Sequence, residues 1–297
     1  MPQKTLRVGF IGMGIMGGPM ALNCRAAGFD LTVYNRTPGK TDPHRQAGAE
    51  VVDSPRAVAE RSDVILSCVT ASEDVLEVVL DEQAGVLAGI AKGATVIDCS
   101  TVAPSVGKQC AEALAGKGCG WLDAPVSGGD VGAQNGTLSI MCGGDREHFD
   151  RAKPVLDAMG KTVTYCGPAG SGYVVKLCNQ ICGAMHLLAA AEAINLAETA
   201  GVDTEAMVQA VSGGAAGSWM LDNLAPKILQ RDFEPGFFVD YQLKDLRLAS
   251  DACHDLSLPL PGLSIVETLF RAASAEGFGR EGTQAIYKTI KSLAGKG

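Results

Sequence analysis

The sequence of 297 residues predicts an α/β protein with two domains, joined by a long helix. Residues 1–168 are expected to form a doubly wound parallel sheet, because short apolar runs alternate with helical segments there. Residues 169–297 are expected to form an all-α domain, because no further strand pattern follows the glycine-rich segment Pro168–Gly172. The length also fits two domains better than one.

Seven short apolar runs are the expected strands, and the first of them lies within the apolar run Thr5–Ile11. They are Arg7–Ile11, Leu31–Tyr34, Val64–Cys68, Thr95–Asp98, Gly120–Ala124, Leu138–Cys142 and Val163–Cys166. Helices are expected between the earlier strands, at Met16–Ala27, Glu73–Leu80 and Ser105–Gly116. Ser127–Gly136 is expected to be a loop, after which Leu138–Cys142 extends the sheet edge in another direction.

The first strand leads directly into Gly12–Gly17, a G-x-G-x-x-G loop that is followed by a helix and a second strand. In this setting Gly12 allows a tight turn, Gly14 leaves room for a pyrophosphate, and Gly17 lets the helix pack on the sheet. The N–H groups and dipole at the helix start favour a phosphate. The loop therefore predicts a Rossmann-type dinucleotide site, the alternative being a structural turn that binds nothing. Its expected cofactor-binding residues are Gly12, Met13, Gly14, Ile15 and Met16.

The end of the second strand indicates which dinucleotide binds. NAD-selective sites usually carry Asp or Glu here, but this chain has Asn35-Arg36-Thr37. Asn35 does not repel a 2′-phosphate, Arg36 can pair with it through a planar guanidinium group, and Thr37 can donate a hydroxyl. We therefore expect NADP as the cofactor, with NAD possible. A solvated arginine in a turn is the alternative interpretation of Arg36.

Composition excludes several classes of protein. The formal charge is −8, with 25 basic and 33 acidic residues and no basic cluster, which disfavours nucleic acid and anionic membranes as partners. No apolar run is expected to reach the length of about 20 residues that spans a membrane. A strand pattern begins almost at once, without a signal peptide, so a cytoplasmic location is expected. The ten cysteines form no C-x-x-C pair and the four histidines are widely spaced, so no disulfide and no metal site is expected.

Residues 173–200 predict one long helix that is apolar on most sides and therefore buried. Its apolar faces need more cover than one small domain provides, which indicates a homodimer or homotetramer.

Lys176 is unusual on such a helix, because burial penalises a charged amine and suits it to proton exchange. Asn179 and Gln180 lie one turn further on, near the same face. A snorkelling lysine at the helix end is the alternative. Further helices are expected at Thr204–Val211, Met220–Gln230, Phe237–His254, Pro261–Glu276 and Gln284–Leu293.

Two further segments are candidates for ligand binding. Ser127, with the N–H groups of Gly128 and Gly129, follows a strand, and ligands of open α/β sheets bind beyond the carboxyl ends of strands. These groups can hold a carboxylate, although a plain turn would have the same composition. Lys244 and Asp245 are adjacent on a later helix, so they face different partners, either at the site or as ordinary surface charges.

Five motifs together resemble the β-hydroxyacid dehydrogenases, a family that includes 3-hydroxyisobutyrate dehydrogenase, tartronate semialdehyde reductase and glyoxylate/succinic semialdehyde reductases. The resemblance covers nearly the whole chain. The motifs are FIGMGIMGGPMALN (Phe10–Asn23), DCSTVAP (Asp98–Pro104), DAPVSGG (Asp123–Gly129), GSGYVVKLCNQ (Gly170–Gln180) and KDLRLA (Lys244–Ala249). Two departures are Met13, where the family usually has Leu, and Gln180, where many members have Asn.

The resemblance implies an NAD(P)-dependent dehydrogenase that interconverts a small 3-hydroxy acid and its semialdehyde. It implies that Lys176 is the catalytic residue and that Lys244 and Val69 contact the cofactor. Thr101 is implied to lie near both nicotinamide and substrate. The residues implied to bind a small carboxylate-bearing substrate are Ser127, Gly128, Gly129, Thr101, Asn179 and Gln180.

Rival interpretations stay open at this point. A glyoxylate or succinic semialdehyde reductase would differ only in substrate. Imine reductases have a similar fold and cofactor loop but generally lack the lysine at position 176, and 6-phosphogluconate dehydrogenases have a larger helical domain. A non-catalytic NADP-binding scaffold is the alternative from another class of protein.

Overall fold

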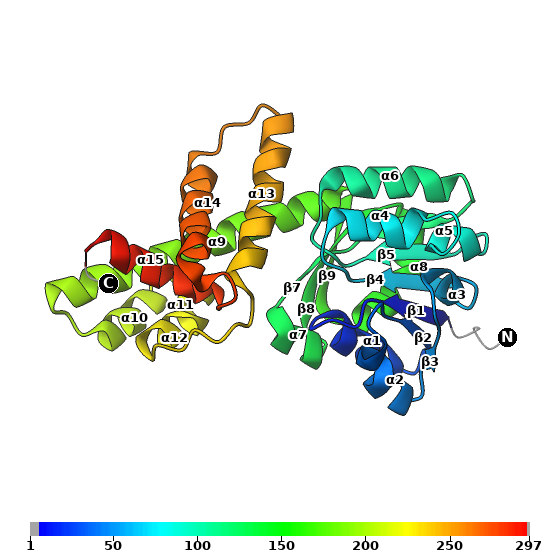
Figure 1. Cartoon of the computed structure of the whole chain (residues 1–297), viewed down its shortest axis with the longest axis horizontal. Helices are drawn as coiled ribbons and strands as arrows, with labels where there is room; N and C mark the ends of the chain where they lie inside the picture. The colour runs from blue at the N-terminus through cyan, green and yellow to red at the C-terminus, as the bar shows by residue number, and fades with distance from the viewer. Residues whose placement is uncertain (1–5, 296–297) are drawn as a thin grey trace. The chain divides into compact units, whose positions relative to one another are not determined.

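The computed structural model describes residues 6–295, so Thr5, where the apolar run begins, lies outside the described residues. The chain divides into two compact units, one ending at Lys176 and the other beginning at Leu177. Both share α9 (Ser171–Ala200), the long helix that the sequence predicts. The first unit is a sheet with helices on both faces and the second contains no strand among its described residues, so the predicted fold class is confirmed (Figure 1).

The sheet of the first unit has the order β3-β2-β1-β4-β5-β6-β8-β7, with β9 also paired to β8. The six strands from β3 to β6 are parallel and follow the order 3-2-1-4-5-6 of dinucleotide-binding sheets, whereas β8 runs antiparallel to β6 and β7. The strands are β1 (Arg7–Ile11), β2 (Asp30–Tyr34), β3 (Glu50–Val51), β4 (Val64–Ser67), β5 (Thr95–Asp98), β6 (Gly120–Asp123), β7 (Val126–Ser127), β8 (Leu138–Gly144) and β9 (Gly160–Gly167).

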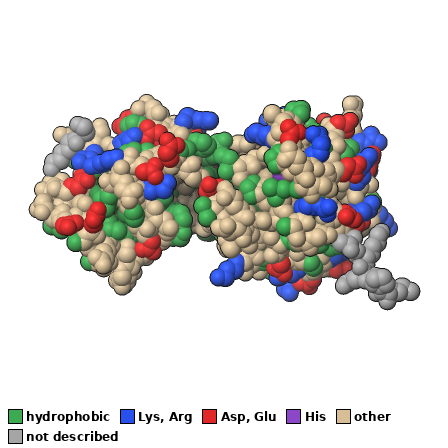
Figure 2. Space-filling view, turned by 90° about the horizontal axis from the view of Figure 1, so that it is seen from below, with side chains coloured by type: hydrophobic (Ala, Val, Ile, Leu, Met, Phe, Trp, Pro, Cys, Tyr) green, Lys and Arg blue, Asp and Glu red, His purple; other side chains and the backbone are tan. Residues whose placement is uncertain are grey.

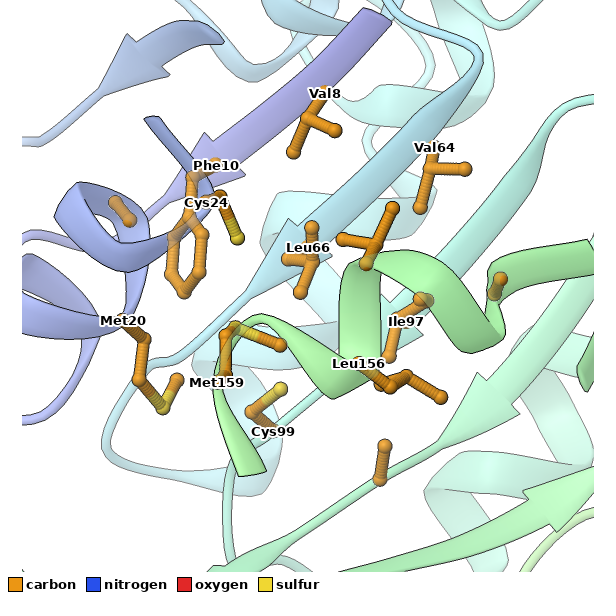
Figure 3. Close-up of a cluster of buried hydrophobic side chains, with 14 of the residues drawn as sticks. Val8, Phe10, Met20, Cys24, Val64, Leu66, Ile97, Cys99, Leu156 and Met159 are labelled. Atoms are coloured by element: carbon orange, nitrogen blue, oxygen red, sulfur yellow. The ribbon is translucent and has the colours of Figure 1, made fainter. Parts of the chain in front are cut away.

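Helices cover both faces of this sheet, because alternate residues of its buried strands point to opposite sides. One core contains Leu66 and Ile97 with residues of α1 and α8, as Figure 3 shows for ten labelled side chains. The other contains Ile65 and Val96 with residues of α4 and α6. The helices of the unit are α1 (Gly17–Ala26), α2 (Asp42–Gln46), α3 (Pro55–Ala59), α4 (Ser72–Leu80), α5 (Val86–Gly89), α6 (Pro104–Ala115), α7 (Gly129–Asn135) and α8 (Arg146–Asp157).

The second unit is built around the part of α9 that follows Leu177. Leu187, Ala191 and Ile194 of α9 pack against Leu246 of α13 and Phe270 of α14 in a single apolar core. The helices of this unit after α9 are α10 (Thr204–Ser212), α11 (Trp219–Asn223), α12 (Ala225–Leu229), α13 (Val239–Asp255), α14 (Pro261–Ala273) and α15 (Ile286–Leu293).

Several sequence expectations are wrong in detail. The expected loop Ser127–Gly136 includes the last residue of β7 and the whole of α7, which is followed by Gly136 in a left-handed conformation. The expected helix Met220–Gln230 is two helices, because Pro226 stands in the first turn of α12 and cannot donate a backbone hydrogen bond. The expected helix Pro261–Glu276 ends as α14 at Ala273, and a wider turn with Gly277 at φ +94° follows.

The long helix also differs from the sequence expectation. It is buried along one side only: Tyr173 and Leu187 are buried, whereas Val174 is 47% and Leu196 is 70% exposed. Among the described residues, α9 is the one helix long and apolar enough to cross a membrane by length and composition, contrary to the expectation that no such run exists. A core helix passes the same test, and buried apolar residues of α9 such as Tyr173 and Leu187 belong to two apolar cores of a folded chain.

Charged side chains of both signs are interspersed over the face of the protein that Figure 2 draws, with hydrophobic side chains between them. The ten cysteines are all free thiols, five of them among the fully or nearly fully buried residues of the two cores of the first unit. Within residues 6–295, no three His, Cys, Asp or Glu side chains are arranged to hold a metal ion.

Candidate active site

The glycine loop lies where the strand order of the sheet reverses, between β1 and β4. Gly12 has φ +97°, and a Cβ on it would lie 2.2 Å from the carbonyl oxygen of Cys68. A Cβ on Gly17 would lie 2.0 Å from the carbonyl oxygen of Gly12, so only glycine lets α1 approach the strand this closely. Gly14, in contrast, faces open space, because a Cβ on it would have no neighbouring atom within 4 Å. The loop thus has room for a pyrophosphate at the position that the sequence indicates.

Asn35 supports the glycine loop rather than standing apart from it. Its Oδ1 accepts a hydrogen bond of 2.8 Å from the backbone N–H of Met13, and its Nδ2 donates to the carbonyl oxygen of Thr37. The first bond ties the end of β2 to the dinucleotide loop, and the second fixes the orientation of the Asn35 amide. The neutral side chain that the sequence associates with a 2′-phosphate therefore also shapes the backbone around it.

Arg36 is exposed and has an acidic neighbour. Its Nη1 lies 3.5 Å from Oδ1 of Asp74 on α4, and its side chain is 81% exposed. Asp74 also accepts a hydrogen bond from the N–H of Ala71 at the start of α4, which fixes its carboxylate. Such an exposed, long ion pair contributes little to stability, so the guanidinium group is available to a phosphate. Lys40, which the sequence analysis did not single out, lines a cavity of about 510 Å³ together with Met13 and Gly14.

Polar residues at the ends of β4 and β5 form a buried network. Asp98 is fully buried, and its Oδ1 accepts hydrogen bonds from the hydroxyls of Ser67 and Ser100, at 2.6 and 2.8 Å. Its Oδ2 accepts from the N–H of Ser100 and from the hydroxyl of Tyr173, at 3.1 and 2.7 Å. Burial raises the pKa of the Asp98 carboxyl, and these donors oppose the increase by stabilising the anion.

The same network reaches two predicted site residues. The hydroxyl of Ser100 accepts a 2.8 Å hydrogen bond from the N–H of Val69, which follows β4 at the reversal point of the sheet. Thr101 comes next in the chain and is partly exposed. Val69 and Thr101 are therefore held on adjacent strand ends, and the carboxylate of Asp98 fixes the backbone between them.

A second buried carboxylate, that of Asp123 at the end of β6, holds the start of α9. Asp98 and Asp123 are register partners on β5 and β6. Asp123 accepts hydrogen bonds from the N–H groups of Gly170, at 2.7 Å, and Tyr173, at 3.1 Å. Burial raises the pKa of the Asp123 carboxyl to about 6, against the opposing effect of these N–H donors. The free N–H groups at the N-terminus of a long helix are the natural partners of such a carboxylate.

Ser127 and the two glycines after it follow Asp123 closely in the chain and stand at the end of β7. Ser127 is the last residue of β7 and is partly exposed, while Gly128 and Gly129 are exposed. Gly128 has φ +136° and Gly129 has φ +65°, conformations that glycine adopts most readily. Their backbone N–H groups and the Ser127 hydroxyl can act together as donors to an anion.

Lys176 lies in the second turn of α9, three residues after Tyr173. Lys176 is the one lysine or arginine of this helix, and it is only 7% exposed. A lysine is rarely buried unless it has a partner or a chemical role, so the structure reproduces the unusual environment that the sequence predicts. The hydrogen bonds of Asp98 and Asp123 hold Tyr173 and Gly170, which lie in the turn immediately before Lys176. Lys176 is also the last residue of the first unit.

In the second unit, Asp245 joins the remaining predicted residues. Its Oδ2 accepts a 2.6 Å hydrogen bond from Nε2 of Gln180, and its Oδ1 lies 3.0 Å from Nζ of Lys244. Nδ2 of Asn179 donates to Oε1 of Gln180. Asp245 is 1% exposed, so the pair with Lys244 is not the ordinary surface pair that the sequence leaves open. The carboxylate instead fixes the amide of Gln180.

Sequence reasoning missed Asp98, Asp123 and Tyr173 as parts of this arrangement. Each aspartate ends an apolar strand run, TVID or GWLD, and that position was a usable signal. The pairing of the two strands and the contact with Tyr173 depend on the sheet, and neither is visible in the sequence.

Comparisons with known proteins identify the class and then the family. A model of the NAD binding domain of 6-phosphogluconate dehydrogenase matches residues 7–167. A model of the NAD-binding region of NADP-dependent 3-hydroxyisobutyrate dehydrogenase matches residues 170–290. Together with the sheet order and the glycine loop, these matches define an NAD(P)-dependent dehydrogenase that acts on CH–OH groups.

Individual relatives are similar over nearly their whole length. The chain is 42% identical to a probable 3-hydroxyisobutyrate dehydrogenase-like protein of Arabidopsis thaliana, covering 98% of this chain and 87% of that one. It is 38% identical to 2-hydroxy-3-oxopropionate reductase of Escherichia coli, covering 97% and 98%. A solved structure of 3-hydroxyisobutyrate dehydrogenase from Mycobacterium tuberculosis with L-serine has a TM-score of 0.89 at 30% identity, covering 97% and 99%. The chain belongs to the β-hydroxyacid dehydrogenase family.

Proposed function

We propose that this protein is an NADP-dependent oxidoreductase that interconverts a small 3-hydroxy acid and its semialdehyde. The substrate class is that of 3-hydroxyisobutyrate dehydrogenase or 2-hydroxy-3-oxopropionate reductase, with glyoxylate or succinic semialdehyde as the alternative. The observation that carries the proposal is the buried Lys176, in the turn of α9 that follows the bonds to the ends of β5 and β6. Ligands of such sheets bind beyond these strand ends.

Lys176 is the proton-exchanging group in this proposal. The nicotinamide, when bound, supplies or accepts the hydride at the carbon of the substrate. In the direction of reduction, the ammonium group of Lys176 donates a proton to the oxygen of the former carbonyl. In the direction of oxidation, the neutral amine accepts the hydroxyl proton. Such general acid–base assistance contributes about 10²–10⁴-fold to the rate.

Ser127, Gly128 and Gly129 hold the substrate carboxylate in this proposal, because a hydroxyl and backbone N–H groups are suitable donors to an anion. Thr101, which follows β5, lies near the reacting carbon of the substrate in this proposal. Asn179 and Gln180 orient the substrate from the turn of α9 after Lys176, and Asp245 keeps the Gln180 amide in one orientation.

NADP is the proposed cofactor because Arg36 is exposed and Asn35 carries no charge. Arg36, Thr37 and Lys40 are suitable donors to a 2′-phosphate, whereas an NAD-selective site would carry a carboxylate at this position. The family resemblance adds Lys244 as a cofactor contact.

We also propose that the protein is a homodimer or homotetramer, since exposed apolar side chains of α9 such as Val174 and Leu196 would be covered by another copy. A cytoplasmic location is proposed as well.

The experiment that tests this function follows the absorbance of the reduced nicotinamide with a panel of acids. In one direction the panel is 3-hydroxyisobutyrate and L-serine, and in the other the semialdehydes of methylmalonate, tartronate and succinate together with glyoxylate. Turnover of one of them, with NADP⁺ for the hydroxy acids or NADPH for the aldehydes, at a kcat/KM well above the others supports the proposal. Binding of NADPH without turnover of any would indicate a scaffold instead.

Lys176 is tested separately by two substitutions. Lys176→Ala should lower kcat by about 10²–10⁴-fold, and Lys176→Arg should do nearly the same, because arginine keeps the charge but does not release its proton. Binding of NADPH should be unchanged in both. Lys161→Ala, which removes an exposed lysine of the same unit, is the control. Near-normal kcat in Lys176→Ala would assign the proton to another group.

A further inference from the structure

The start of α9 is attached to the sheet through two carboxylates and one tyrosine. Tyr173 is fully buried, and its hydroxyl donates to Asp98 while its backbone N–H donates to Asp123. Because Asp98 and Asp123 are register partners on adjacent strands, this single residue spans both strand ends. A Cβ on Gly172 would lie 2.5 Å from the carbonyl oxygen of Asp123, so the helix touches the strand end directly.

The hydrogen bonds to the Asp98 carboxylate come from two serine hydroxyls, a backbone N–H group and a phenol, and each of these donors is uncharged. Burying a carboxylate in this way is costly, and an apolar side chain would join the core at lower free energy. What the carboxylate provides is geometry. It fixes Ser100, which holds Val69, and it fixes Tyr173, which precedes Lys176 by one helical turn.

We propose that Asp98, Asp123 and Tyr173 are positioning residues for the reaction, holding Lys176 at a fixed place relative to the strand ends that carry Val69 and Thr101. The inference rests on the proposed role of Lys176 as the proton-exchanging group. It goes further because it assigns a role in catalysis to three buried residues that contact neither cofactor nor substrate in the proposed site. Residues i and i+3 of a helix lie on neighbouring positions of one face, so a shift of Tyr173 is passed to Lys176.

The sharpest variant is Tyr173→Phe, which removes one hydroxyl and leaves the packing of the ring. Loss of the bond to Asp98 releases the first turn of α9 from the end of β5. We expect kcat to fall by roughly 10- to 100-fold, since a misplacement of about 1 Å from a distant substitution can reduce the rate to that extent. The KM for NADPH should change by less than about twofold, because the dinucleotide loop keeps its own contacts.

Tyr287→Phe is the matched control. Tyr287 is also buried, and its hydroxyl donates to a carboxylate, that of Glu198, at 2.6 Å. Both variants lose one phenol-to-carboxylate hydrogen bond, so their thermal unfolding midpoints should fall by similar amounts. Only Tyr173→Phe should lose kcat. Equal kcat values in the two variants would show that the Asp98 bond serves stability alone.

A second comparison separates this inference from the proposed function. In the Lys176→Ala background, Tyr173→Phe should have no further effect on kcat, because no amine remains to be misplaced. An equal loss in both backgrounds would overturn the positioning role while leaving Lys176 as the proton carrier. If Lys176→Ala itself retained near-full kcat, the proposed function would fail instead.

Discussion

The buried carboxyl of Asp123 should make the free energy of unfolding depend on pH, in a direction that follows from its pKa. Burial raises the pKa of this carboxyl to about 6 from its ordinary value of 3.8. Between these two values the folded protein binds more protons than the unfolded chain. The contribution of Asp123 to stability is therefore fully present below about pH 4 and is lost as the pH rises through about 6. A difference of about 2 units corresponds to about 3 kcal/mol.

The perturbation is Asp123→Asn, which is similar in size and does not titrate. The asparagine loses part of its acceptor capacity towards Gly170 and Tyr173, and that loss is the same at every pH. The free energy of unfolding of the wild-type protein should therefore exceed that of the variant most at pH 4. We expect this excess to shrink by up to about 3 kcal/mol between pH 4 and pH 7.

The assay is urea unfolding of the first unit, followed by the fluorescence of Trp121. Trp121 is buried on β6, two residues before Asp123, and replacing the exposed Trp219 with Phe leaves it as the single tryptophan. Asp81→Asn is a control of opposite sign, because backbone N–H groups of Ala84 and Gln83 lower the pKa of Asp81. For that variant the wild-type advantage should be complete above about pH 4 and should shrink only as the pH falls below that value, so it stays nearly constant between pH 4 and pH 7. An Asp123→Asn difference that stays constant or grows with pH would refute the reasoning.

Two further predictions concern the cofactor-binding region. Asp74→Asn removes the carboxylate that competes with a 2′-phosphate for Arg36. The ratio of kcat/KM for NADPH over NADH should therefore rise several-fold, most clearly at low ionic strength. An unchanged ratio would mean that Arg36 does not bind this phosphate. Gly17→Ala should lower the thermal unfolding midpoint sharply, because its Cβ would collide with the Gly12 carbonyl oxygen. Gly14→Ala should leave the midpoint unchanged, because its Cβ would meet no protein atom, but it should raise the Kd for NADPH in titration calorimetry.

The parallel sheet could be predicted from sequence because its strands are short, apolar and widely spaced by helices. Thr95–Asp98 was predicted to the residue, since all four of its residues are buried. The two-residue strands β3 and β7 carry too few residues to give a pattern. Helix α7 was missed because Gly129–Asn135 is rich in residues of low helix propensity, and its place between β7 and β8 decides its conformation.

The predicted site residues are of two kinds in this respect. The glycine loop is local, so its three glycines and the flanking strand and helix sufficed to locate it. The placement of Lys176 is not local, because it depends on two aspartates 53 and 78 positions earlier that become neighbours only when β5 pairs with β6. A sequence shows that a lysine stands on an apolar helix, but the reason it can be held there lies in the sheet.

The composition of α9 follows from the two tasks that this helix performs. Tyr173 joins the core of the first unit, and residues such as Leu187 and Ile194 join the core of the second, so one helix needs apolar side chains over most of its length. Those requirements alone would be met by a helix without any lysine, since burial of an amine opposes folding. Lys176 stands where the helix leaves the first unit, directly after the turn that two buried carboxylates hold. A stability requirement explains neither the amine nor the buried anions, whereas a reaction that needs a proton at one fixed point explains both.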